Sequence, residues 1–522
     1  MRNDNYYLNV SRSSDLEKKS EKILYRFLEM LPGLLSWTTL LLAIVVSYFF
    51  PFLAAGFIII FAFYWLCRTI YFSLYLASGF QIMKKNEKKD WLEVLESLPR
   101  EKYSIPLTHW SEIYHLVIIP TYKESETILS NTLSSIANNN YPAKKIIVVL
   151  ALEERAGPEQ QKIARRVVKE FEDKFLELLI TIHPANLPGE IAGKSSNETW
   201  GTRVVKEKVI DALMIPYQNI ILTSLDSDTV VYPQYFACLT YSYLTVDNPT
   251  RTSFQPIPLY INNIWEASPI SRVFAFSSTF WHTINQERPE KLITFSSHSM
   301  SFQALVDINY KQTNVVSEDS RIFWQCLLKF DGDYKVLPLH YPVSMDANVA
   351  PSFIQTAVNV YKQKRRWAYG AENIPYFLFG FRKNKKIPFL KKVILGSEVI
   401  EGQLTWATAP ILIYFLGWLP IIFGQAEFSD AVFLHNLPII LSRVLTLSML
   451  GLIVSVYLSI LLLPPRPPHY GRSKLLILTI QWFLVPLTMI FFSALPALEA
   501  QTRLMLGKYL GFWPTPKFRK ND

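Results

Sequence analysis

Almost uncharged apolar runs at both ends of the chain constrain its fold more strongly than any other feature. The first covers residues 34–77. A single helix of that length would overshoot a hydrocarbon core of roughly 30 Å, so we predict two spans joined by a tight turn at Pro51. Later runs at residues 404–423, 437–463 and 475–495 are each long enough to cross once. Half of all residues are hydrophobic and 14% are aromatic, and together with the long uncharged runs this composition indicates an integral membrane protein.

Basic residues flank the first pair of spans on both sides, which predicts that both flanks are cytoplasmic. They are Lys18, Lys19, Lys22 and Arg26 before the pair and Lys84, Lys85, Lys88 and Lys89 after it. We expect a cell membrane protein whose central domain is cytoplasmic.

The C-terminal runs leave the topology open. Residues 425–435 contain no lysine or arginine and suit the outside, whereas Arg466, Arg472 and Lys474 suit the inside. Three crossings would then leave the tail outside, although the tail is basic. Its basic residues are Arg503, Lys508, Lys517, Arg519 and Lys520. Either one run is a re-entrant hairpin, or the positive-inside rule fails at this end.

The net charge of +10 does not indicate nucleic acid, because the basic residues lie largely beside apolar segments. Anionic lipid headgroups explain them, so we expect the bilayer as a partner and no nucleic acid. The three cysteines are too scattered for a disulfide framework or a cysteine-rich zinc site. The polar start of the chain shows no cleavable signal peptide, so the N-terminus is predicted to be retained.

Between about residues 90 and 382 the composition becomes that of an α/β domain. Residues 115–120, 145–150 and 220–225 are predicted buried strands, and residues 127–138 a helix. Such alternation predicts a mostly parallel sheet, in which ligands bind beyond the carboxyl ends of the strands.

Asp226 and Asp228 directly follow the third predicted strand. Two carboxylates separated by one residue can converge on a divalent ion such as Mg²⁺ or Mn²⁺, which usually shares its ligands with substrate phosphates. Alone, such a pair is often a solvated turn. Its place after a buried strand favours a metal site.

Glu318 and Asp319 precede a predicted helix at residues 321–329. Acidic residues are common in a first helical turn, because they interact favourably with the helix dipole. One of the two could instead be a general base that removes a proton from a hydroxyl group. A helix N-terminus would hold such a base firmly, so the two interpretations are compatible.

Gln363, Arg366 and Trp367 lie in a basic cluster before a membrane segment. Such clusters usually bind lipid headgroups, with tryptophan at the interface. An arginine beside a tryptophan could instead bind a diphosphate while the indole stacks on a sugar ring. The spacing alone does not decide between these interpretations.

In their order, these motifs resemble the membrane-integrated members of glycosyltransferase family 2, which include cellulose, chitin, hyaluronan and poly-N-acetylglucosamine synthases. Further matching elements are residues 119–124 (IPTYKE), 138–142 (NNNYP) and 193–197 (GKSSN). The resemblance covers about half of the chain. It implies a GT-A type α/β domain between transmembrane helices, and inverting transfer from a nucleotide-sugar, most simply a UDP-sugar.

The resemblance also implies roles for individual residues. Asp319, with Glu318 beside it, would be the base, and Asp228 with Asp226 would hold Mg²⁺ or Mn²⁺. Donor contacts would come from Thr121, Tyr122, Glu124, Lys194, Asp226 and Arg366. Gln363 and Trp367 would contact the acceptor.

Two segments depart from the family pattern. At the end of the second strand, Glu153 stands where most relatives have an aspartate pair, and it is expected to recognise the base of the donor. In place of a glycine-rich acceptor loop, the chain has residues 295–302 (FSSHSMSF), where His298 could contact the acceptor or serve a structural role.

The expected organisation has six parts, which are listed here: a cytoplasmic segment at 1–30, two spans at 31–79, a glycosyltransferase domain at 80–372, an interfacial segment at 373–400, about three spans at 401–497 and a basic tail at 498–522. The leading hypothesis is processive synthesis of a polysaccharide with translocation through the membrane. Alternatives are a single transfer to a lipid or polyprenyl carrier, and a transporter or receptor with an α/β regulatory domain. Few ionisable residues lie in the membrane runs, which disfavours transport.

Overall fold

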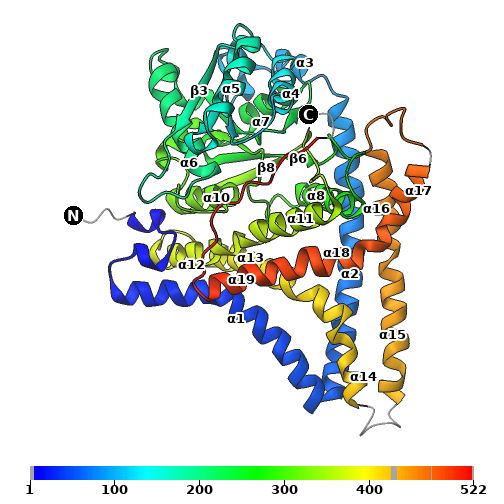
Figure 1. The fold of residues 1–522 in the computed structure, drawn as a ribbon. Coiled ribbons are helices and arrows are strands. Elements are labelled where there is room, and N and C mark those ends of the chain that lie inside the picture. The colour runs from blue at the N-terminus through cyan, green and yellow to red at the C-terminus, as the bar shows by residue number, and fades with distance from the viewer. Residues whose placement is uncertain (1–4, 425–431, 472, 520–522) are drawn as a thin grey trace.

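The computed structural model describes residues 5–424, 432–471 and 473–519. Figure 1 shows an α/β domain above a layer of crosswise helices, from which other helices extend away from the domain. The predicted fold class, an α/β domain between apolar helices of the N- and C-terminal regions, is confirmed. The parts of the charge pattern at residues 425–431, Arg472 and Lys520 lie outside the described residues.

Two long helices form the N-terminal membrane region. Helices α1 (Lys19–Phe49) and α2 (Pro51–Glu87) meet at Phe50, so the predicted break at Pro51 is confirmed. Proline suits the first position of a helix, because the N–H group there has no intrahelical acceptor. Pro32 lies inside α1, where a missing N–H promotes a bend. In Figure 1 the first part of α1 lies beneath the domain and the second part turns away from it.

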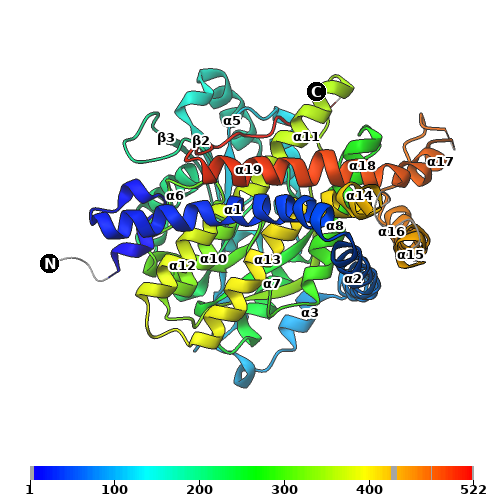
Figure 2. The same ribbon diagram turned by 90° about the horizontal axis from the view of Figure 1, so that it is seen from below.

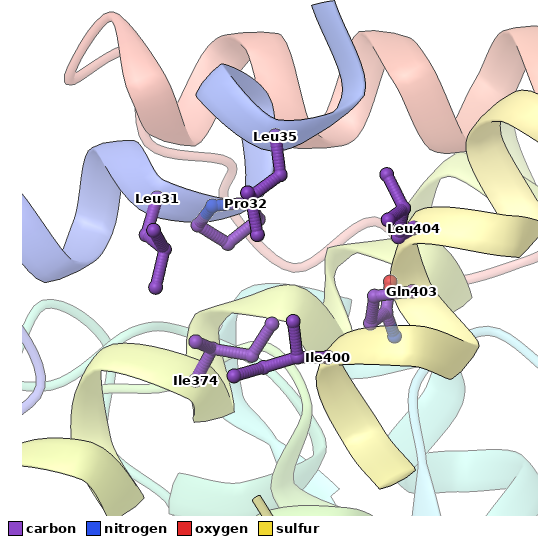
Figure 3. A pocket seen from close by; sticks show the side chains of 7 residues that line it. All are labelled: Leu31, Pro32, Leu35, Ile374, Ile400, Gln403 and Leu404. Carbon is purple, nitrogen blue, oxygen red and sulfur yellow. The ribbon is translucent and has the colours of Figure 1, made fainter. Parts of the chain in front are cut away.

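A small pocket lies beside the bend of α1 (Figure 3). It has no room for a water molecule, and its walls come from α1, α12 (Asn373–Lys383) and α13 (Phe389–Tyr414). The lining residues are Leu31, Pro32, Leu35, Ile374, Ile400, Gln403 and Leu404. All but Gln403 are apolar, so the pocket is a packing gap where α1 leaves the two other helices.

The C-terminal membrane region contains further apolar helices. After α13, the chain turns by 47° into α14 (Leu419–Gly424). Helices α15 (Val432–Ser448) and α16 (Leu450–Leu461) follow. By length and composition, four helices in the described part of the chain could cross a membrane, and the bent pair would be a fifth. The four are Lys19–Phe49, Pro51–Glu87, Asn436–Leu461 and Ser473–Met505. This supports integration into a membrane.

The last apolar segment lies in a different direction from the others. It contains α17 (Ser473–Ile480), α18 (Val485–Met489) and α19 (Leu495–Met505). Figures 1 and 2 show α19 alongside the first part of α1 and crosswise to α2 and α15. Residues 506–519 then return to the α/β domain (Figure 1). If the other four segments each cross once, the basic tail lies on the side of the domain, in agreement with the positive-inside rule.

The domain contains a sheet of eight strands in the order β3-β2-β1-β4-β7-β6-β8-β5. Four neighbouring strands are parallel: β1 (Tyr114–Thr121), β2 (Ile146–Glu153), β3 (Glu177–His183) and β4 (Ile220–Ser224). The others are β5 (Val230–Val231), β6 (Thr252–Leu259), β7 (Ser299–Ser301) and β8 (Lys335–Ser344). Strand β7 is antiparallel to β4 and β6, and β5 is antiparallel to β8. Strand β6 is also parallel to β8, so parallel pairing, as predicted, occurs in both halves of the sheet, and the sheet as a whole is mixed.

Helices cover both faces of the sheet and enclose two hydrophobic cores. One face carries α3 (Trp91–Glu96), α4 (Glu126–Ala137), α5 (Pro158–Phe171) and α7 (Tyr235–Thr245). The other carries α6 (Lys194–Val205), α9 (Phe302–Asp307), α10 (Glu318–Lys329) and α12. Helices α8 (Pro269–Gln286) and α11 (Phe353–Ala368) lie between the domain and the membrane helices.

Helix α12 lies within residues 373–400, which were predicted to form an interfacial segment. It does lie between the α/β domain and α1, but Tyr376, Phe377 and Phe379 are buried in the same core as α10. Its apolar run therefore packs largely inside the protein.

Candidate active site

The predicted site residues gather at the carboxyl ends of β1, β2 and β4, next to the first turns of α6 and α10. Asp226 and Asp228 follow β4 directly. The loop between them is fixed, because Leu225 N–H donates to Ile118 O at 3.0 Å and the Thr132 hydroxyl donates to Ser227 O at 2.8 Å. This is the edge where sheets of this kind bind ligands.

Lys194 joins the two acidic motifs. Its ammonium group donates to Asp226 Oδ1 at 2.8 Å and to the two carboxylate oxygens of Asp319 at 3.0 and 2.9 Å. Burial by itself would lower the pKa of Lys194, but Asp226 and Asp319 raise it well above the ordinary value. The lysine therefore remains charged and holds a carboxylate from β4 and one from α10 on a single cation.

Glu318 and Asp319 have opposite protonation states at neutral pH. Burial would raise the pKa of Asp319, but the ammonium groups of Lys194 and Lys311 outweigh it and hold the pKa below the ordinary value. Burial and the neighbouring charge of Asp319 raise the pKa of Glu318 to about 8. Of the two predicted catalytic acids, Asp319 is therefore the one that is ionised and able to accept a proton.

Replacing Glu318 by Gln should change how stability depends on pH. The pKa of Glu318 is about 8 in the folded chain and its ordinary value is 4.5, so its contribution to stability is full below 4.5 and is lost as the pH rises to about 8. A glutamine at this position cannot ionise. The Tm of E318Q minus that of the wild type should therefore increase from pH 4.5 to 8 in thermal unfolding curves. The exposed control E96Q should show no such trend, and an equally flat difference for E318Q would contradict the assignment.

The C-terminal tail crosses the site. Lys517 Nζ lies 2.5 Å from Asp228 Oδ2, and Arg519 bonds both oxygens of Asp346. Further back along the tail, Phe512 packs against Gly193 at the start of α6, where an added Cβ would lie 2.6 Å from the Phe512 ring. A side chain at residue 193 would therefore displace the tail.

Four of the predicted donor residues form a group at the ends of β1 and β2. Thr121 ends β1, and Tyr122 N–H donates to Glu124 Oε2 at 2.6 Å in the turn that follows. Glu153, which ends β2 and is 5% exposed, pairs with Arg155. The Arg155 guanidinium lies 4.7 Å from the centre of the Tyr122 ring. Because β1 lies between β2 and β4, these residues share the sheet edge with Asp226.

Three further predicted residues lie on α11 and contact protein. Gln363 accepts a hydrogen bond from Asn348 at 3.3 Å. Trp367 stacks on Phe274 of α8, with ring centres 5.4 Å apart. The Arg366 guanidinium lies over the ring of Phe512, 4.8 Å from its centre. These two residues therefore pack against α8 and the tail, and their role in binding a ligand stays a prediction.

His298 lies beside Asp319. Its Nδ1 is 2.8 Å from Phe295 O and 3.8 Å from Asp319 Oδ1. Burial lowers the pKa of His298 to about 3, so the ring is neutral. With Nδ1–H donating to the carbonyl, Nε2 is an acceptor, and it is buried without a partner in the described residues. Nδ1 therefore holds the ring to the loop, and Nε2 is a buried acceptor without a partner in the described residues.

Several residues of the site were not identified from the sequence. Ser296 donates to Asp226 Oδ2 at 2.7 Å, and Lys311 lies 4.0 Å from Asp319 while it pairs with Glu198. Asp346 and Lys517 also belong to this group. Asp346 follows a run of alternating apolar residues, which is a signal for a strand end, but Lys517 has no local signal because the tail reaches the site only through tertiary folding.

The carboxylates of the site could hold a metal ion only if the phosphates of a bound ligand and water completed its coordination. No group of three or more His, Cys, Asp or Glu side chains that could hold a metal occurs in the part of the chain that the structure describes. Asp228 has one buried oxygen, Oδ1, without a hydrogen-bond partner in that part. Mg²⁺ and Mn²⁺ often bind one or two carboxylates and take their other ligands from phosphates and water. The residues present are compatible with such an ion.

The chain was compared with protein families, curated proteins and solved structures, and the solved structures gave matches. No protein-family model and no curated protein matches the chain. The structure is similar to that of the mannosyltransferase PcManGT from Pyrobaculum calidifontis, crystallised with GDP-Man and Mn²⁺: 14% identity, 84% of this chain and 99% of that chain, TM-score 0.40. It is also similar to S. aureus TarS with UDP-GlcNAc: 15% identity, 72% and 91%, TM-score 0.32. Scores this low support no inference about function, which therefore rests on the side chains of the site.

Proposed function

We propose that the protein is a membrane-bound glycosyltransferase that moves a sugar from a nucleotide-sugar to an acceptor hydroxyl, with inversion at the anomeric carbon. One observation carries this proposal: Lys194 bonds Asp226 at the end of β4 and Asp319 at the start of α10. Asp226, in the proposed donor site, and Asp319, the proposed base, thus bind the same ammonium group. They are therefore close enough to act on one donor and one acceptor.

In the proposed reaction Asp319 is the general base. Its ionised carboxylate takes the proton of the acceptor hydroxyl while the oxygen bonds to the anomeric carbon of the donor sugar. The bond between that carbon and the diphosphate oxygen breaks, and the nucleoside diphosphate leaves. In this reaction His298 Nε2 would accept a hydrogen bond from the acceptor and so orient it.

Positive charge is available for the leaving diphosphate. Arg366 Nε is buried and has no hydrogen-bond partner in the described residues, so it is ready to donate to a phosphate oxygen. A bound Mg²⁺ or Mn²⁺ would neutralise the developing charge as the glycosidic bond breaks. Glu153 and Arg155 offer an acceptor and a donor for the edge of a uracil or guanine base.

The acceptor side of the site supports a polymer as product. Lys364 lies 4.3 Å from the ring centre of Phe274, 5.0 Å from that of Trp367 and 5.8 Å from that of Trp406. These aromatic side chains reach from α11 to α13, which continues toward the membrane region. Aromatic faces suit sugar rings, so we propose that a growing polysaccharide leaves along them and across the membrane.

A direct assay tests the function. Purified protein in detergent would receive labelled UDP- and GDP-sugars with Mn²⁺, and both the released nucleotide and the size of the product would be measured. A high-molecular-weight product is expected. A product extracted with lipid would indicate a single transfer to a lipid or polyprenyl carrier. If none of the donors releases a nucleotide, the proposal is wrong.

Replacing Trp367 by Ala should separate acceptor use from donor use. Loss of a stacking surface for the acceptor sugar should reduce polymer formation by about tenfold or more, the factor that corresponds to ~1.4 kcal/mol. Hydrolysis of the donor by water should fall much less. The exposed Trp281, which lies on α8, provides the control W281A. Equal losses of both activities in W367A would count against an acceptor role.

A further inference from the structure

Asp346 is a second carboxylate beside Asp228. Strand β8 ends at Ser344, and two residues later the N–H group of Asp346 donates to Asp228 Oδ2 at 3.1 Å. The two residues, Asp228 and Asp346, are 1% and 9% exposed. Two buried carboxylates in such proximity require positive charge beside them.

Asp226 is differently placed. Its Oδ1 accepts from Lys194 and its Oδ2 from Ser296, so both oxygens already have short hydrogen bonds to the protein. In contrast, Asp228 Oδ1 is buried and has no partner in the described residues. A cation that enters the site therefore meets a free oxygen on Asp228 but would have to displace Lys194 or Ser296 from Asp226.

Two cations of the tail now neutralise the pair. Lys517 Nζ lies 2.5 Å from Asp228 Oδ2, and the Arg519 guanidinium bonds Asp346 at 2.7 and 3.1 Å. Their combined charge equals that of one divalent ion. The ammonium and guanidinium groups thus supply the positive charge that the two carboxylates require.

We propose that Asp228 and Asp346, and not Asp226, are the protein ligands of the divalent cation, and that Lys517 and Arg519 occupy the same site in its absence. The role of this ion at a donor diphosphate rests on the proposed function, whereas binding of the ion does not. The chemistry is that of a hard cation with two carboxylate ligands, completed by phosphate oxygens and water.

Binding of Mn²⁺ alone tests the ligand set. The full chain in detergent would be titrated with Mn²⁺, with the free ion measured by electron paramagnetic resonance, in the presence and absence of UDP or GDP. D228N and D346N should each weaken binding by at least the roughly 10- to 100-fold that loss of a supporting residue causes. D226N should change it much less. D333N, an exposed carboxylate before β8, is the matched control.

A double variant controls for loss of binding that is caused by misfolding. D346N alone leaves Arg519 without its carboxylate partner, so the double variant D346N/R519A removes both charges. It should unfold at about the wild-type Tm and still bind Mn²⁺ weakly. If either Asp346 variant binds like the wild type, or if D226N loses binding while D346N keeps it, the ligand assignment is overturned.

The tail is tested separately. K517A/R519A should bind Mn²⁺ about tenfold more tightly or better, because charge-assisted hydrogen bonds to buried carboxylates no longer have to break first. Unchanged or weaker binding would overturn the competition between tail and metal.

Failure of this proposal can be distinguished from failure of the proposed function. If Mn²⁺ binding depends on Asp346 but no donor is consumed, the function fails and the metal site stands. If a donor is consumed while binding depends on Asp226, the function stands and the metal site fails.

Discussion

The D319N variant should lose about 10²- to 10⁴-fold in turnover, the range over which a positioned general base contributes. Asn has nearly the same shape as Asp and can still contact Lys194, but it cannot accept a proton. Donor binding should therefore remain close to wild type. The release of nucleotide in the presence of acceptor measures turnover, and equilibrium binding of the donor measures the ground state.

Two comparisons make the D319N result specific. E318Q should keep most of the activity, because the pKa of Glu318, at about 8, means that this residue is already neutral at neutral pH. D333N, an exposed substitution, should not differ from the wild type. Normal turnover in D319N, or a loss in E318Q as large as in D319N, would remove Asp319 from the role of base.

The parts of the fold that the sequence predicts are those with local signals. Continuous apolar strands predicted β1, β2 and β4, and Pro51 predicted the break between α1 and α2. The antiparallel strand β7 was not predicted, because Ser299–Ser301 is short, contains two serines and pairs through Thr223 and Ser299 inside the sheet. Its formation depends on neighbours that the local sequence does not contain.

The same distinction holds in the candidate site. Asp226, Asp228, Glu318 and Asp319 could be predicted because their positions follow from a strand end and a helix start. The opposite protonation of Glu318 and Asp319 could not, since it depends on Lys194 and Lys311, which come from other segments. The basic tail was expected only as a topological marker. Its contacts with Asp228 and Asp346 place it in the site instead.

The path of the C-terminal tail determines which positive charges reach the carboxylates of the site. Residues 506–519 reach the carboxylates only because α19 lies crosswise beside the first part of α1 (Figure 2). Arg26 of α1 donates to Leu504 O at 3.0 Å, and Tyr509 donates to Glu29 Oε2 at 2.9 Å. The membrane-proximal helices therefore determine where the tail enters the α/β domain.

Replacing Lys194 by Met should affect both stability and catalysis. Asp226 and Asp319 would lose their shared cation while they remain buried. Breaking a buried ion pair in this way costs about 3–5 kcal/mol, although protonation of one carboxylate limits the cost. Thermal unfolding should show a lower Tm. The exposed Lys208 of the same region gives the control K208M, for which no change is expected.

The pH dependence of K194M separates a positioning role from simple loss of stability. In the wild type, Lys194 is the largest influence that lowers the pKa of Asp319 against burial. Without it the pKa of Asp319 rises, so the base becomes protonated at higher pH and the acidic limb of the pH–turnover profile should move toward neutral pH. K194R retains the charge and should move the limb back toward its wild-type position. An acidic limb that stays in place in K194M, with activity reduced in proportion to the folded fraction, would mean that Lys194 serves only the fold.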